Sequence, residues 1–410
     1  MREMKKEARR EPIGVDHAIL EDNPLLLLGR FLSPWSTTEQ IAKAVTVPGE
    51  KAGDWEPFLT YALRQWCTPL LYEQLQSHDL VDSLPFAVQD TLRQHCLTNR
   101  VRNVVFRKAL LSLIRQCNAK NIEIVLLKGA ATFADNLYQS AGGRAMLDID
   151  LLVKQDTLDE VRKMLVEQGL EEIFDPGKVP DGLPTDDRHA HINGYRKPGT
   201  PMMVELHYNV AYGQGGRIVS ARQAWQHLDQ EQLDGEKTFI LTPTWRLVHN
   251  TVHGLIPSRD YIRGEIRFLH LLEFAYLARR YWYEIDWCIW LQAAKSERAE
   301  TAFLSYLHLA CKVFDMPWPQ TLARSRSALF QGKRLALASS YAAKQVAYGA
   351  DRCSLFYMLC MRWYYYLMLP FWVWKNVCYA PGPGNFPVRI RIILKKILSS
   401  RSRRKIRYRN

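Results

Sequence analysis

The sequence lacks the cysteine patterns of disulfide frameworks and of zinc modules. Its eight cysteines are scattered along 410 residues, and no CxxC pair or other metal-ligand spacing occurs. Scattered thiols of this kind are typical of a cytosolic protein, in which they stay reduced and mostly buried. We therefore expect no disulfide framework.

Long apolar runs are also absent. The run Leu25–Leu28 is too short for the core of a signal peptide, so we expect no secretion. The uncharged, aromatic-rich run Trp363–Trp374 has twelve residues, whereas a transmembrane helix needs about twenty. The wider run Leu355–Val377 reaches that length only by including two charged residues, and a proline interrupts it. A bundle-packed or interfacial helix fits this segment better than a membrane span.

Two common catalytic signatures are missing as well. The chain shows neither a glycine-rich P-loop nor a Ser-His-Asp arrangement. His249 and His253 share one face of an expected helix, but the residues between them lack the glutamate of a zinc-protease motif. We expect this pair to be packed or hydrogen-bonded, with a place in an acceptor pocket as the alternative. His189 and His191, just before an expected strand, are candidates to face a nucleotide.

The net charge of +13 is concentrated in a short C-terminal tail. Residues 389–410 hold ten of the 55 lysines and arginines and no acid, so the rest of the chain has 45 basic against 42 acidic residues. A nearly neutral body does not indicate nucleic-acid binding. The run Val388–Leu398 resembles a cationic amphipathic helix that lies on a surface. For residues 388–410 the alternatives are attraction to an anionic membrane, a solvated tail and, third, RNA binding. The expected location is cytoplasmic, with a peripheral place at the inner membrane face as an option.

The apolar patterning predicts helices on both sides of a central α/β unit. Ser36 and Glu39 fit a capping box that begins a helix, and Pro48-Gly49 is expected to end it. A long helix is predicted over residues 88–113, and helices resume at Pro243. We predict an N-terminal helical region (15–119), an α/β core (120–240), a C-terminal helical region (241–350), an aromatic-rich helix (351–380) and a basic tail (385–410).

The predicted core begins with a buried strand. Ile122–Leu127 is short, β-branched and apolar, and a helix over residues 130–138 follows it. Next come, in chain order, a strand (149–153), an amphipathic helix (158–168), a loop (174–187) and a hairpin (192–196 with 202–208). Strand, helix, strand, helix and hairpin together describe one compact α/β unit.

Three carboxylates lie in or beside these apolar strands. Asp148 and Asp150 are two residues apart and therefore point to the same face of a strand, and Glu205 lies in the short apolar run Val204–His207. An ionised carboxylate flanked by apolar residues is costly unless something binds it. Because Mg²⁺ prefers carboxylate oxygens, we predict that these acids hold one or two Mg²⁺ ions. Glu205 is either the third ligand or the base that deprotonates an acceptor.

The turn before the first core helix supplies candidates for phosphate binding. Gly129 would let backbone amides approach phosphate oxygens closely, at the positive end of the helix that follows. Lys128 and Arg144 could contact the phosphates through their charge. Metal ions, positioned phosphates and an in-line nucleophile are what nucleotidyl or phosphoryl transfer requires.

Three runs of the sequence together resemble the uncharacterised nucleotidyltransferase family, which has a polymerase-β-like fold. They are Leu126–Gly129, Arg144–Val153 and Val204–His207, and the resemblance extends over residues 20–330. It implies an α+β fold, in which a nucleotidyltransferase-type mixed sheet with helices is flanked by N- and C-terminal helical regions.

The resemblance also assigns residues. It implies that Asp148 and Asp150 are metal ligands and that Glu205 is the third acid. His207, which ends the third run, joins Lys128, Gly129 and Arg144 as a candidate nucleotide contact. Where broader members of the superfamily have Gly-Ser or Gly-Gly, this chain has Lys128-Gly129, as this family does.

The predicted activity is therefore Mg²⁺-dependent transfer of NMP from an NTP, such as ATP, to a hydroxyl or similar group of a small molecule or protein. One alternative is a catalytically inactive member that binds a nucleotide or a partner protein. Another is a membrane-surface adaptor that acts through the basic tail. The sequence leaves the acceptor open.

Overall fold

The structure, a computed structural model, describes residues 23–50, 55–140, 142–173, 190–256, 261, 264 and 266–349, and within them seven strands form one mixed sheet. Across the sheet the order is β3 (Glu171–Glu172), β4 (Tyr195–Arg196), β5 (Met203–His207), β2 (Ile149–Val153), β1 (Ile124–Leu126), β7 (Glu236–Leu241) and β6 (Leu228–Leu233). β2 runs parallel to β5 and β1 parallel to β7, whereas the other neighbouring strands are antiparallel.

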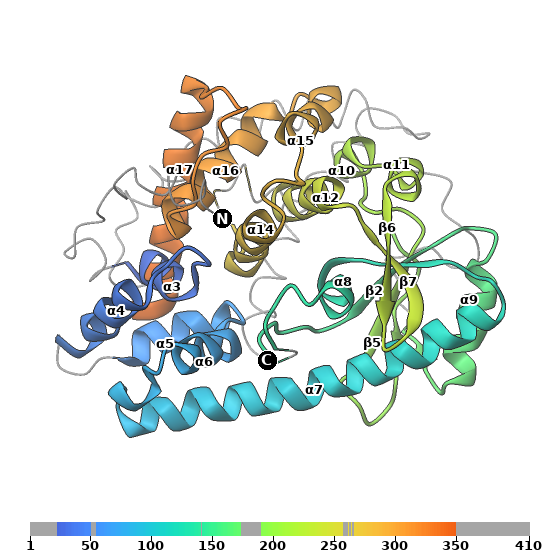
Figure 1. Ribbon diagram of the computed structural model, residues 1–410, viewed down its shortest axis with the longest axis horizontal. Coiled ribbons are helices and arrows are strands. Elements are labelled where there is room, and N and C mark those ends of the chain that lie inside the picture. The colour runs from blue at the N-terminus through green and yellow to red at the C-terminus, as the bar shows by residue number, and fades with distance from the viewer. Residues whose placement is uncertain are drawn as a thin grey trace, which may run out of the picture. The chain divides into compact units, whose positions relative to one another are not determined.

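Helices precede and follow this sheet in the chain (Figure 1). The N-terminal ones are α3 (Pro24–Leu32), α4 (Thr38–Glu50), α5 (Trp55–Arg64), α6 (Thr68–Ser77), η1 (Val81–Ser83) and the long α7 (Phe86–Ala119). Between the strands lie α8 (Lys128–Asp135), α9 (Leu158–Glu167), α10 (Gln214–Ile218) and α11 (Ala221–Gln226). After the sheet come α12 (Pro243–Leu255), α14 (Phe268–Arg280), α15 (Trp287–Ala293), η2 (Lys295–Glu297), α16 (Glu300–Phe314) and α17 (Arg326–Tyr348). The predicted α+β fold, with a mixed sheet and helices on both sides in the sequence, is confirmed.

The two faces of β2 belong to different parts of the core. Ile149, Leu151 and Val153 pack into one apolar cluster with residues of α7 and α9, whereas Leu152 packs into a second cluster with residues of α12 and α14. Side chains alternate between the faces of a strand, so Asp150 shares the face of Leu152. Asp150 therefore lies on the side of the sheet that packs against the C-terminal helices α12 and α14.

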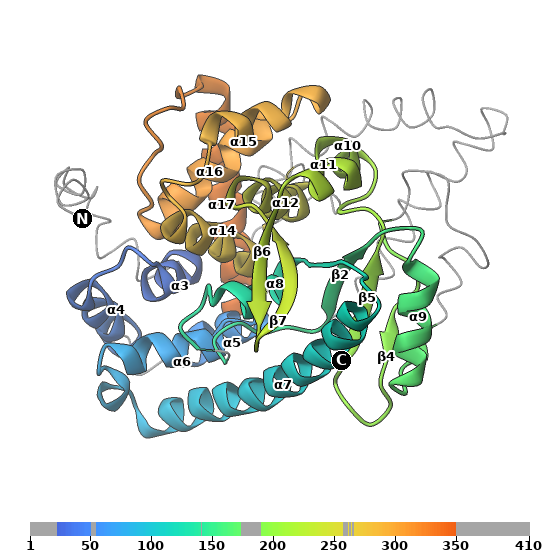
Figure 2. The ribbon, with the colours of Figure 1, turned by 45° about the vertical axis from the view of Figure 1, so that its right-hand side comes forward.

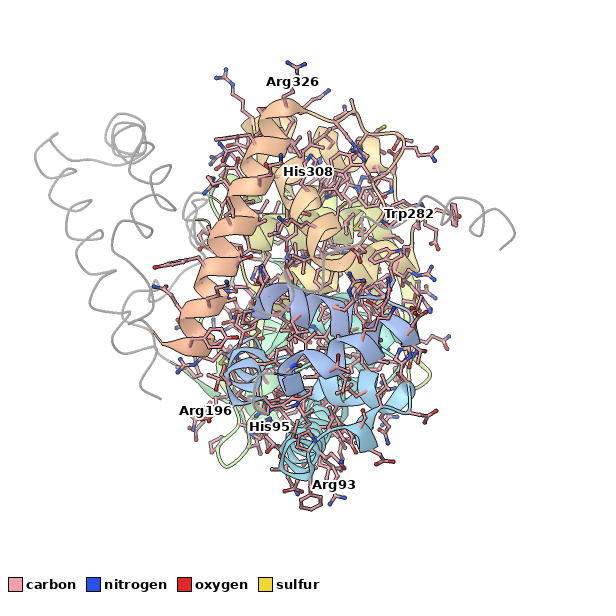
Figure 3. The ribbon with its side chains drawn as sticks, turned by 90° about the vertical axis from the view of Figure 1, so that its left-hand side faces the viewer. Arg93, His95, Arg196, Trp282, His308 and Arg326 are labelled. Atoms are coloured by element: carbon pink, nitrogen blue, oxygen red, sulfur yellow. The ribbon has the colours of Figure 1, made fainter. Side chains whose placement is uncertain are left out.

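Helices from opposite ends of the described chain pack directly on each other. α3 contacts α16 and α17, and α5 contacts α17. A Cβ atom added to Gly29 of α3 would lie 2.3 Å from the backbone oxygen of Val313 in α16, so a glycine is needed where these helices cross. Figure 3 shows the N-terminal helices between α17, which begins at Arg326, and α7, which carries Arg93 and His95.

Several element boundaries differ from those predicted. The N-cap of α4 is Thr37, not Ser36, because Thr37 Oγ1 accepts from the amide of Gln40 while the Gln40 side chain accepts from the amide of Thr37. Pro48 does not end α4, which continues to Glu50. A proline this near the end of a helix removes only one late hydrogen bond.

The helix after β1 also differs from the prediction. It begins at Lys128 rather than Ala130, and it ends at Asp135 because Asn136 adopts a left-handed conformation with φ 50°. Lys128 itself has φ 47°. The lysine-glycine turn is thus part of the helix start, which fixes the direction of the lysine side chain.

The hairpin of β6 and β7 was not predicted (Figure 2). Its turn is Asp234-Gly235, with φ values of 49° and 82°, and Asp-Gly between two strands is a strong hairpin signal. The alternation of apolar and polar residues before this turn is weak, because β6 is half-exposed and rich in polar residues. The bounds of α17 were likewise not predicted.

The predictions for residues 174–187, 351–380 and 385–410, and for His189, lie outside the described residues. Among the helices that the structure describes, none combines the length and the apolar content needed to cross a membrane.

Candidate active site

Two neighbouring parallel strands bring the predicted acids together. β2 and β5 are in a register that pairs Asp150 with Glu205 and Leu152 with His207. Because side chains two residues apart share a face, Glu205 and His207 point to the same side of the sheet as Asp150. Asp148 directly precedes β2 and lies two residues from Asp150.

Asp150 lies at the centre of the cluster and has 2% of its surface exposed. Its Oδ1 atom accepts from Lys128 Nζ at 2.6 Å and from His207 Nε2 at 2.9 Å. Burial on its own would raise the pKa of Asp150, but the charges and hydrogen bonds of Lys128 and His207 hold it well below the ordinary value. The buried carboxylate is therefore ionised and is matched by fixed cationic and hydrogen-bonding groups.

Asp148 is in the opposite electrostatic situation. Burial, followed by repulsion from the charge of Asp150, raises the pKa of Asp148 to about 6. Two carboxylates in one site commonly separate in this way because both cannot ionise without cost. A cation placed between them would remove that cost.

Glu205 and His207 complete the cluster. His207 Nε2 lies 3.7 Å from Glu205 Oε2, and His191 Nε2 lies 3.6 Å from the same oxygen. The other ring nitrogen of His207 faces the backbone oxygen of Asn209 at 3.3 Å. An imidazole whose Nδ1–H donates to a carbonyl presents Nε2 to a metal in many protein sites, and an ion bound there would take the place of the Nε2 proton that Asp150 accepts here.

One group of side chains in the described part of the chain has the geometry to hold a metal ion. One ligand atom each from Asp150, Glu205 and His207 lie within 4.8 Å of one another. The set contains two of the three acids predicted from the sequence. The third member of the set is His207, which was predicted as a nucleotide contact. His207 lies two residues after Glu205 in β5, so the two side chains share one face of the strand.

His191 was predicted to face a nucleotide, and the structure places it at this cluster. Its backbone pairs in the antiparallel sense with that of His207, and the centroids of the two imidazole rings are 4.9 Å apart.

Lys128 and Gly129 lie at the start of α8, beside this cluster. The lysine side chain is 20% exposed and reaches Asp150. A Cβ atom on Gly129 would lie 2.5 Å from Met146 Sδ and 2.7 Å from Arg144 Nη1, so the glycine permits close packing of the loop before β2. That contact is a second reason for a glycine here, besides the predicted approach of a phosphate.

Arg144 makes a buried ion pair with α14. Its Nε atom is 2.7 Å from Glu273 Oε2, and its Nη1 donates to the backbone oxygen of Ala145. The sequence did not predict Glu273 as the partner of Arg144. The contact of Arg144 with phosphate stays a prediction, whereas the structure shows Arg144 fixing the loop that leads to Asp148.

Two asparagines of α7 hold the same loop and were missed in the sequence. Asn99 and Asn103 both donate to the backbone oxygen of Arg144, at 3.1 and 2.8 Å. Both are almost fully buried. The signal available was a pair of asparagines four residues apart on the apolar side of a helix, where an amide is costly unless it is hydrogen-bonded.

His249 and His253 are packed beside this site rather than arranged around a zinc ion. The His253 ring lies 4.6 Å from that of His270 on α14. Burial, with the nearby charge of Lys128 for His249 and of Arg267 for His270, lowers the pKa of His249 and His270 to about 3. These rings are neutral at pH 7, and they belong to the C-terminal helices α12 and α14.

Comparison with known proteins yields two similarities. Residues 51–315 match the family model described as uncharacterised nucleotidyltransferase. A solved structure, an antigenic nucleotidyltransferase-like protein from Paracoccidioides brasiliensis, is 17% identical, and the match covers 48% of this chain and 89% of that one, with a TM-score of 0.30. No curated protein matches the chain.

Proposed function

The chain belongs to the uncharacterised nucleotidyltransferase family, and from that premise we propose that it transfers NMP from an NTP to an acceptor hydroxyl with the help of a divalent metal ion. The observation that carries the proposal is the convergence of Asp150 and Glu205 on one sheet face through the β2–β5 register, with Asp148 two residues before Asp150. Acids that only stabilised the fold would not need to be gathered in one partly buried cluster.

The residues present fit a divalent ion. Carboxylate oxygens of Asp150 and Glu205, together with the Nε2 atom of His207, form the possible ligand set, and Asp148 lies close enough to interact electrostatically with both of these carboxylates. Mg²⁺ is the ion that the sequence predicts. When bound, such an ion neutralises the triphosphate and polarises the attacking oxygen.

The reaction itself needs little from the chain except position and charge. The acceptor oxygen forms a bond to the α-phosphorus, the bond from that phosphorus to the β-phosphate oxygen breaks, and pyrophosphate leaves with the electron pair. Glu205 takes the proton of the acceptor hydroxyl. Lys128, the start of α8 at Gly129, Arg144 and His207 form the proposed nucleotide side of the site.

A labelling experiment tests this proposal. The full chain is incubated with each α-labelled NTP, Mg²⁺ and cell extract, and the labelled acceptor is then identified. We expect Asp148→Asn and Asp150→Asn to reduce labelling by at least roughly 100-fold, the upper end of what loss of an outer-shell metal partner costs. Circular dichroism and thermal melting check that both variants are folded.

Asp159→Asn is the matched control. Asp159 lies on α9 with 85% of its side chain exposed, and it is paired with Arg162 outside the acidic cluster. This variant should label acceptors as the wild type does. Undiminished labelling by a folded Asp148→Asn, Asp150→Asn double variant would overturn the proposal.

One observation favours a second candidate function. Lys128 contacts Asp150 Oδ1, and if this contact is kept when a nucleotide binds, that oxygen is not free for a catalytic ion, and the site would bind a nucleotide without turning it over. That inactive alternative predicts binding of Mg²⁺ and NTP in calorimetry, with no pyrophosphate release in any extract tested.

A further inference from the structure

The ammonium group of Lys128 occupies a position among the three carboxylates of the site. Its Nζ atom lies 2.6 Å from Asp150 Oδ1. The lysine side chain is 20% exposed, and the carboxylate that it contacts is 2% exposed. The site therefore contains a cationic group that belongs to the chain.

The backbone holds Lys128 in this position. The residue begins α8 with φ 47°, directly after the buried Leu127, so its side chain leaves the helix start toward β2. Gly129 packs against Met146 and Arg144 with no room for a Cβ atom. Because α8 is so closely packed here, the lysine cannot retreat by a shift of the helix, and only a rotation of its side chain would vacate the site.

The charges of the site match one divalent ion together with this lysine. Asp148, Asp150 and Glu205 carry three negative charges when all are ionised, and one ammonium and one divalent ion balance them. Before a nucleotide binds, a second divalent ion would leave two positive charges in excess, and it would have to approach the ammonium closely. At short range and in a partly buried site, like charges repel strongly.

The donor atoms agree with this count. Asp150, Glu205 and His207 supply ligand atoms for one ion. Asp150 Oδ1 accepts from both Lys128 and His207, so the ammonium and the possible metal position lie beside the same carboxylate oxygen. Asp148 does not belong to this ligand set.

From this arrangement we infer that the site works with one divalent ion and that Lys128 takes the place of a second. The inference rests on the proposed nucleotidyl transfer and deepens it. The ammonium donates hydrogen bonds to an α-phosphate or acceptor oxygen and lowers the charge there, but it cannot coordinate several oxygens as a metal ion does.

Equilibrium dialysis of the full chain against Mn²⁺ and a non-hydrolysable α,β-methylene NTP analogue tests the inference. Bound Mn²⁺ and bound analogue are measured separately. Their ratio gives the number of ions per bound nucleotide and does not depend on enzymatic activity. We expect one Mn²⁺ per analogue in the wild type and two in Lys128→Met, in which the carboxylates are intact and the ammonium is gone. Lys128→Arg, which keeps a cation, should give one.

Lys154→Met is the control. Lys154 follows β2, where it pairs with Glu123 at 2.7 Å outside the cluster, so its loss should leave the count at one. Two ions per analogue in the wild type would overturn the inference, and so would one ion in a folded Lys128→Met. Both results leave the proposed function intact. Binding of neither Mn²⁺ nor analogue by the wild type would instead count against the proposed function itself.

Discussion

At the scale of single residues, Asp135 and Arg246 form a buried ion pair outside the acidic cluster. It joins the last residue of α8 to α12, and both side chains are almost fully buried. Tyr281 also donates to Asp135 at 2.8 Å. Since Lys128 lies at the other end of α8, this pair fixes the helix that positions the lysine.

We expect Arg246→Met to destabilise the protein by about 3–5 kcal/mol, because it leaves the carboxylate of Asp135 buried without its counter-ion. Replacing both partners by apolar residues should cost less than replacing the arginine alone. Urea unfolding measures both. Arg115→Met is the control, because Arg115 is 58% exposed where it pairs with Glu236; it should cost about 0–1 kcal/mol. Equal losses in Arg246→Met and Arg115→Met would contradict this account.

At the same scale, the sequence predicted the acids better than their partners. Asp148, Asp150 and Glu205 could be found because a carboxylate in an apolar strand is costly and therefore conspicuous. The contact of Lys128 with Asp150 could not be predicted from the sequence, because it depends on the φ of 47° that Lys128 adopts at the start of α8. The ion pair of Arg144 with Glu273 joins residues 129 positions apart, and no local pattern specifies it.

At the scale of elements, α12 and α14 carry histidines that make stability depend on pH. The pKa of His249 and of His270 is about 3 in the folded protein, chiefly because of burial, whereas an unfolded histidine titrates near about 6.5. Between these values the unfolded chain binds protons that the folded chain does not bind. The stability contributed by neutral rings is therefore complete above about pH 6.5 and is lost progressively as the pH falls.

We expect His270→Gln to reduce this dependence. Each buried ring contributes a slope of roughly 1 kcal/mol per pH unit, so the free energy of unfolding of the variant should fall less steeply between pH 6.5 and pH 4. Urea unfolding at several pH values measures the slopes. Because other groups titrate over the same range, the slope difference between variant and wild type is the test. Identical slopes would show that His270 is not held neutral.

Elements with a strong apolar period were predictable, and those without one were not. β1 and β2 are buried along their whole length, and α7 runs through the predicted residues 88–113. β6 alternates poorly because it lies at the edge of the sheet and is mostly half-exposed. α17 lies within the region 241–350 that was predicted to be helical, but its own bounds were not predicted.

At the scale of the whole molecule, helices separated by most of the chain pack into one layer, and this could not be predicted. The division into domains that include the regions 15–119 and 241–350 stays a prediction. Within the described residues, helices of both regions contribute to one apolar cluster. The apolar pattern of an amphipathic helix shows which of its faces is buried, but it does not show which other element packs against that face. The contact between α3 and α16 is decided by Gly29, which lies in an apolar run and gives no signal of its own.

Gly29→Ala tests whether this contact joins the two ends of the chain. In an isolated helix the change would stabilise by up to about 1 kcal/mol. Here the added methyl group would lie 2.3 Å from the backbone oxygen of Val313, which cannot rotate away. We therefore expect a net destabilisation of about 1–3 kcal/mol, as for other overpacked cores, together with earlier proteolytic release of the N-terminal helices. Urea unfolding and limited proteolysis measure the two effects. A more stable variant would show that α3 and α16 are not held at this distance.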